Sequence, residues 1–166
     1  MKYKLLFLSF LLLLSSCTST IPNIIMTYTG EGSLRYYIRQ ETVKKGNVDS
    51  MFDFAVVFDD DTVTQDIVVN YTLSVKNFSL SETEKVAIDF IGDGNVYPLT
   101  FVDVIFKDPQ KAQVRITAML TADQFVDLVS NNSQTVEVRF THPDMETLTV
   151  RSKGLEEKFE EFRILL

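Results

Sequence analysis

The residues that could support acid–base or nucleophilic catalysis are few, because the chain has one histidine and one cysteine. His142 lies in the sequence Thr141-His142-Pro143-Asp144. A Ser–His–Asp triad would need His142 as its base and a serine from elsewhere in the chain. The chain has no Gly-x-Ser-x-Gly nucleophile elbow, and Thr-His-Pro-Asp is typical of a turn. We therefore predict a turn at His142 and assign no catalytic residue.

Two groups of acidic residues could bind calcium, which takes six to eight oxygen ligands. The first is Asp59-Asp60-Asp61, but consecutive side chains diverge in extended structure and the spacing is not that of an EF-hand loop. The second is Asp89 with Asp93. The surrounding Gly92-Asp93-Gly94-Asn95 is already explained as a hairpin turn. We predict a solvent-exposed turn, a hairpin, no metal site and no cofactor.

An acid pair for glycoside hydrolysis could come from any two of the 23 Asp and Glu residues. Sugar-binding clefts usually carry exposed aromatic rings, typically those of tryptophan. The chain has no tryptophan. Tyr36-Tyr37 would place one ring outward in a strand. That ring could stack on a sugar or fill a cross-strand site, and we favour the cross-strand site.

Cys17, the only cysteine, follows a segment with the proportions of a secretory leader. Lys2 and Lys4 form a positive start, and residues 5–14 are nearly all Leu or Phe. This ten-residue segment is too short for a bilayer-spanning helix, which needs roughly 20 apolar residues. An ordinary signal peptide with an incidental cysteine is one interpretation.

The sequence Leu14-Ser15-Ser16-Cys17 resembles the lipobox of bacterial lipoproteins. This resemblance implies cleavage before Cys17, a diacylglyceryl thioether on its sulfur, and acylation of the new amine with a fatty acid such as palmitate. It covers only the first tenth of the chain. We accordingly divide the chain into a signal peptide (1–16), a lipidated tether (17–23) and a single domain (24–166).

Charge excludes one class of partner. The whole chain carries 16 Lys and Arg against 23 Asp and Glu. Removal of residues 1–16 takes two lysines and leaves a net charge of -9 on the mature chain. Nucleic acids need clustered positive charge, so none is expected as a partner. Several acyl chains anchor a protein stably without help from its surface.

Beyond the tether, apolar residues alternate with polar ones, as in half-buried strands. We predict about eight or nine strands, in an antiparallel sandwich or bent sheet rather than a closed barrel. One of these begins near Val96 and continues past Pro98 to Phe106. The segments with this alternation lie near 24–28, 34–39, 52–58, 67–76, 86–90, 96–106, 114–120, 136–140 and 148–150.

Two segments show helical spacing instead. Thr121 and Gln124 form a capping box before the stripe Phe125, Leu128 and Val129. The C-terminal segment has a stripe of Leu155, Phe159, Phe162 and Leu166. The polar residues between them, Lys158 included, are predicted to face water.

These observations lead us to expect a non-enzymatic binding or assembly module with an unknown ligand. It would be attached through Cys17 to a membrane of the bacterial envelope, on the outer side of the inner membrane or at the outer membrane. Its partners would be the membrane and another envelope protein. A hydrolase using His142 or an acid pair, and a calcium-dependent adhesin using Asp59 to Asp61, are the alternatives.

Overall fold

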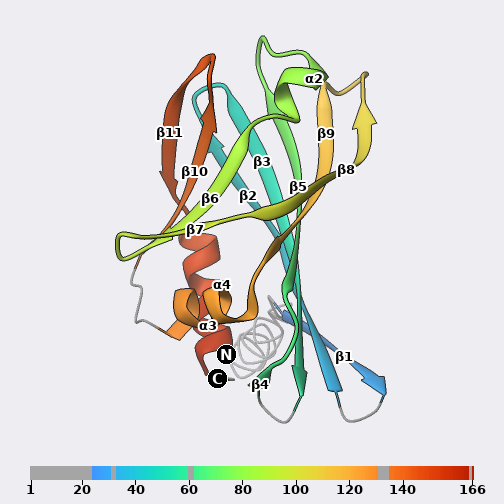
Figure 1. Ribbon diagram of the computed structural model, residues 1–166, viewed down its shortest axis with the longest axis vertical. Helices are drawn as coiled ribbons and strands as arrows, with labels where there is room; N and C mark the ends of the chain where they lie inside the picture. Colours follow the sequence, from blue (N-terminus) through green and yellow to red (C-terminus); the bar gives the residue numbers. More distant parts are fainter. Residues whose placement is uncertain (1–23, 31–32, 60–61, 131–134, 165) are drawn as a thin grey trace, which may run out of the picture.

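The computed structural model contains two antiparallel sheets that face one another, with helices at the top and at the bottom of this view (Figure 1). The structure describes residues 24–30, 33–59, 62–130, 135–164 and 166. The predicted signal peptide and tether lie outside the described residues. The prediction of a mainly β, antiparallel, sandwich-like fold is confirmed.

The larger sheet has seven strands in the order β1-β2-β3-β5-β9-β8, with β4 paired to β3. The register pairs are antiparallel throughout. Its strands are β1 (Ile24–Gly30), β2 (Ser33–Lys45), β3 (Val48–Asp59), β4 (Thr62–Val63), β5 (Ile67–Val75), β8 (Thr100–Asp108) and β9 (Gln113–Leu120).

The smaller sheet has the order β11-β10-β6-β7. Its strands are β6 (Ala87–Gly92), β7 (Asn95–Pro98), β10 (Val136–His142) and β11 (Met145–Arg151). Asp93 and Gly94 connect β6 to β7 with φ angles of 48° and 87°. Two consecutive positive φ angles suit a tight hairpin, so the predicted hairpin is confirmed.

The strand predicted from Val96 to Phe106 is instead two strands in different sheets. β7 ends at Pro98, and β8 begins at Thr100 in the larger sheet. Proline has no N–H to donate to a ladder, so it suits the point where the chain leaves one sheet for the other. This division, together with the two-residue β4, raises the strand number among the described residues to eleven.

The described helices are α2 (Leu80–Thr83), α3 (Ala122–Ser130) and α4 (Lys153–Arg163). The capping box predicted at α3 is present, because the Thr121 hydroxyl accepts from the Gln124 N–H at 3.2 Å. Thr121 N–H in turn donates to the Gln124 side chain at 3.1 Å. The four-residue α2 was not predicted, although Ser79 and Glu82 have the Ser-x-x-Glu spacing of a capping box.

Two predictions for the C-terminal stripe are wrong. Leu166 is exposed, because α4 ends at Arg163 and the stripe ends with it. Lys158 is buried and does not face water. The other three stripe residues, Leu155, Phe159 and Phe162, are buried as predicted.

The inner face of the larger sheet is covered in two ways (Figure 1). The smaller sheet covers the upper part in this view, which we call the sandwich half. Helices α3 and α4 cover the lower part, the helical half, where β1 and the C-terminus also lie. Phe159 of α4 joins the two, since its ring centroid lies 5.8 Å from that of Phe54 on β3 and 6.5 Å from that of Phe90 on β6.

Candidate functional sites

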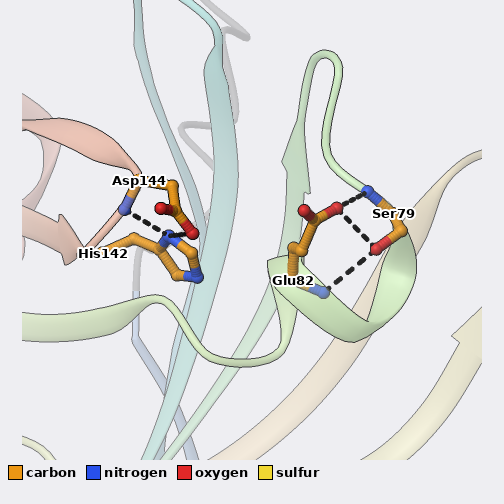
Figure 2. A network of polar contacts seen from close by, with 4 residues as sticks. All are labelled: Ser79, Glu82, His142 and Asp144. Carbon is orange, nitrogen blue, oxygen red and sulfur yellow. Dashed lines mark hydrogen bonds and ion pairs between the residues drawn. The ribbon is translucent and has the colours of Figure 1, made fainter.

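His142 closes a turn at the end of β10. Its side chain is 4 % exposed, and its Nδ1 accepts a hydrogen bond from the Asp144 N–H at 3.1 Å (Figure 2). This hydrogen bond occupies the lone pair of Nδ1. The Asp144 carboxylate is 3.9 Å from the same nitrogen. The prediction of a turn at His142 is confirmed.

Ser79 belongs to a separate network (Figure 2). Its hydroxyl donates to the Glu82 carboxylate at 2.6 Å and accepts from the Glu82 N–H at 3.3 Å. Hydrogen bonds from the Ser79 side chain and backbone hold the pKa of Glu82 below its ordinary value. The ring of Phe78 packs edge-on against His142 at 4.8 Å. The hydrogen bonds of Ser79 thus serve a helix cap, and that of His142 serves a turn.

Asp59 and Asp89, from the two acidic groups, lie in different sheets. Asp59 is exposed at the end of β3, while Asp60 and Asp61 lie outside the described residues. Asp89 accepts two hydrogen bonds from the Arg139 guanidinium, at 2.8 and 2.6 Å. Within the part of the chain that the structure describes, no three His, Cys, Asp or Glu residues are grouped so that they could hold a metal ion.

A groove of about 430 Å³ lies between β2 and the β11–α4 junction. Its β2 side begins at a bulge, where the register with β3 shifts between Ile38 and Glu41. Before the bulge, Ile38 pairs with Phe54; after it, Glu41 pairs with Phe52. Because Phe52 faces the core, the bulge turns Glu41 inward, where regular alternation would place Gln40.

Glu41 fastens β2 to α4 in this groove. Its carboxylate accepts a hydrogen bond from the Lys158 ammonium at 2.6 Å, and the two side chains are 22 % and 6 % exposed. A Cβ atom on Gly154 would lie 2.2 Å from the Glu41 carboxyl group, so only glycine admits this approach to the first turn of α4. The carboxylate there is favoured by the helix dipole.

A second acidic residue, Glu156, lies in the same first turn of α4. Glu156 accepts from Arg151 Nε at 2.7 Å and from the Val136 N–H at 3.0 Å. The Arg151 hydrogen bond, more than any other contact, lowers the pKa of Glu156 from its ordinary value. Lys44, also in the groove, pairs with Asp49 at 2.6 Å. Of these ion pairs, Glu41–Lys158 joins β2 to α4, so the charged side chains at the groove have a structural role.

The feature that sequence reasoning missed is an apolar surface on β8, an edge strand of the larger sheet. Four of its nine residues are large, apolar and exposed. We call them the β8 ridge: Phe101 (76 % exposed), Val102 (52 %), Ile105 (57 %) and Phe106 (56 %).

Two irregularities create the ridge. The register between β8 and β9 shifts between Thr100 and Asp103, and again between Val104 and Phe106. Phe101, Val102 and Ile105 fall in these shifts, and Phe101 has a φ angle of 49°. Bulges commonly re-aim side chains, and a non-glycine residue at positive φ is strained. The adjacent apolar pairs 101–102 and 105–106 interrupt alternation and could have signalled the bulges in the sequence.

Among the described residues, no helix combines the length and apolarity needed to cross a membrane. Comparison of the chain with protein-family models, with curated proteins and with solved structures found no match.

Proposed function

We propose that this protein is a lipid-anchored bacterial envelope protein whose β domain binds another protein and catalyses no reaction. Cys17 carries the lipid, and the domain stands on the outer side of the inner membrane or at the outer membrane. The resemblance of Leu14-Ser15-Ser16-Cys17 to a lipobox supports the anchor. The observation that carries the binding role is the β8 ridge.

Three properties of the β8 ridge favour protein binding. Protein interfaces centre on a few large side chains that insert into a partner's pockets, and two phenylalanines with two aliphatic side chains suit that role. Edge strands usually protect themselves with charges or with bulges that twist the edge away. Here the bulges themselves carry the apolar side chains, and Phe101 keeps a strained backbone. The irregular ladder favours insertion of side chains into a partner's apolar groove over addition of a partner strand.

The anchor is tested by metabolic labelling with a fatty-acid probe and by mass spectrometry of the mature N-terminus. Wild-type protein is expected to begin at an acylated Cys17. Cys17→Ala is expected to remain unlabelled and uncleaved. A mature chain that begins at another residue, or a labelled Cys17→Ala variant, contradicts the anchor.

The binding role is tested by placing a photo-crosslinking amino acid at Phe101 in intact cells. The matched control is Val96, which is also apolar and exposed (44 %) but lies on β7 in the other sheet. We expect one discrete crosslinked product from position 101 and none from position 96. Introducing Ile105→Asp should abolish the product, because loss of one anchoring side chain costs about 2 kcal/mol or more.

Two outcomes contradict this proposal. Equal products from positions 96 and 101 would show that the ridge has no preference for a partner. A product of twice the mass of the chain would show that a second copy covers the ridge, and self-association would then replace partner binding.

A further inference from the structure

We infer that the flank of β1 and the end of α4 rest on the lipid bilayer, so that the domain has a defined membrane-facing side. This inference rests on the proposed lipidation of Cys17. The surface in question, the membrane-facing patch, is exposed and apolar. It consists of Ile25 (53 % exposed), Met26 (61 %), Tyr28 (65 %), Ile164 (80 %) and Leu166 (41 %).

The two parts of this patch belong to one end of the molecule. Met26 pairs with Tyr36, whose ring packs against Phe162 near the end of α4 at 6.0 Å. Ile164 follows Phe162 by two residues. β1 and the C-terminus both lie in the helical half, at the bottom of the view in Figure 1. The patch thus spans a sheet edge and the neighbouring helix end.

The length of the tether favours the lipid bilayer as the surface that covers the patch. Only residues 18–23 separate the lipidated Cys17 from Ile24, the first residue of β1. The seven residue-to-residue steps from Cys17 to Ile24 reach roughly 25 Å, at most ~3.5 Å per step. β1 itself is about as long, since seven residues at ~3.4 Å per residue span about 24 Å. The start of β1, at Ile24, is therefore kept within about 25 Å of the bilayer.

The side chains of β1 match the boundary between lipid and water. Aliphatic side chains and Met gain free energy by leaving water for the acyl region, and Tyr is enriched at the interface. Both faces of β1 contribute, because edge strands expose both: Ile25 shares a face with Tyr37, and Met26 and Tyr28 lie on the opposite face.

Charge sets the lipid that the patch prefers. Arg35 and Arg39 lie on β2 behind β1, but Asp59 at the end of β3 is acidic, and the mature chain has a net charge of -9. Anionic headgroups would repel this charge. Apolar contact therefore holds the patch on the bilayer, and zwitterionic lipid is favoured over anionic lipid.

The absence of tryptophan from the chain makes the test direct. Single tryptophans are introduced as Met26→Trp and Ile164→Trp in the patch, and as Phe106→Trp on the β8 ridge. Phe106, at 56 % exposure, is matched to Met26 at 61 %. Each full-length protein is purified from membranes, checked by mass spectrometry for acylation of Cys17, and reconstituted into phosphatidylcholine nanodiscs containing doxyl-labelled lipid.

We expect doxyl lipid to quench most of the fluorescence of the Met26→Trp and Ile164→Trp proteins and to leave that of the Phe106→Trp protein unchanged. Replacing part of the phosphatidylcholine with phosphatidylglycerol should reduce the quenching. Equal, weak quenching at all three positions in protein with an acylated Cys17 overturns the membrane-facing patch and leaves the lipid anchor standing. Protein without an acyl group on Cys17 overturns the anchor and the patch together.

Discussion

The sandwich half and the helical half cover the same sheet face with different chemistry. In the sandwich half, the smaller sheet presents alternating apolar side chains such as Ile88, Phe90, Val138 and Phe140 to the core. In the helical half, α4 adds a buried ion pair, Glu41–Lys158, to its apolar stripe. Alternating apolar side chains pack the sandwich half against the larger sheet. The helical half also uses an ion pair between two residues that are 117 positions apart in the sequence.

The difference follows from geometry. A sheet packed on a sheet contacts it along whole strands, so alternation alone aligns the two faces. A helix 11 residues long contacts the sheet along one stripe and must be fixed at its ends. The bulge at Glu41, the absence of a Cβ at Gly154 and the cap at Ser152 all act at the first turn of α4.

Phe159→Ala should have the largest effect, because this ring contacts both halves. It packs edge-on against Phe54, Phe90 and Phe125 and is 1 % exposed. We expect a loss of about 3–5 kcal/mol in the free energy of unfolding, measured by urea denaturation. Unfolding should remain a single transition, because one core serves both halves.

The control for this variant is Phe101→Ala, which removes the same ring from a site that is 76 % exposed. Its expected change is within about 0.5 kcal/mol. If Phe159→Ala cost no more than this control, α4 would not be part of the core. Two separate transitions in the wild-type protein would show that the halves unfold independently.

Lys158→Ala tests the ion pair of the helical half. It leaves the Glu41 carboxylate, which is 22 % exposed, without its cation. Removing one partner of a fully buried ion pair lowers the free energy of unfolding by about 3–5 kcal/mol. Because water reaches part of the Glu41 carboxylate, we expect a loss of about 2 kcal/mol, measured by urea denaturation.

Lys44→Ala is the matched control, because Lys44 pairs with Asp49 at the same 2.6 Å but with side chains 65 % and 47 % exposed. Such surface pairs contribute at most about 1 kcal/mol. If Lys158→Ala and Lys44→Ala lowered the free energy of unfolding equally, the buried ion pair would not distinguish the helical half from the sandwich half.

The sequence predicts a structural feature well when the residues that determine this feature are close together in the chain. The stripe of α4, the Thr121 capping box and the Asp93-Gly94 hairpin depend on neighbours within a few residues, and all three were predicted. Lys158 was misassigned because its partner is on β2 and is turned inward by a bulge. The exposure of Phe101 was missed because the register shift arises when β8 pairs with β9, and the adjacent apolar pairs within β8 were its local signal.

Gly154→Ala tests the close approach at the start of α4. A Cβ there would lie 2.2 Å from the Glu41 carboxyl group and displace it from Lys158. We expect a net loss of about 1–2 kcal/mol despite the higher helix propensity of alanine. In a Glu41→Ala background the same substitution should become stabilising by up to about 1 kcal/mol.

The sign reversal is specific to the helical half. Gly46, in the turn between β2 and β3, has a φ angle of 58°. Gly46→Ala should therefore be destabilising by about 1 kcal/mol whether or not Glu41 is present, because strain in the backbone is its cause. If Gly154→Ala had the same effect in both backgrounds, the Glu41 contact would not restrict this position.

Ser50→Ala and Ser152→Ala should have the smallest effects, with opposite signs in the two halves. The Ser50 hydroxyl on β3 is buried and, within the described structure, has no hydrogen-bond partner. Removing it eliminates an unsatisfied polar group, so we expect a gain of about 1 kcal/mol. The Ser152 hydroxyl caps α4 by accepting from the Leu155 N–H, so its removal should cost about 1 kcal/mol.

Urea denaturation of both variants and of the double variant should give effects that cancel, since independent sites are additive. A destabilised Ser50→Ala protein would mean that this hydroxyl is satisfied in solution, and the sandwich half would then share the dependence on polar contacts that distinguishes the helical half.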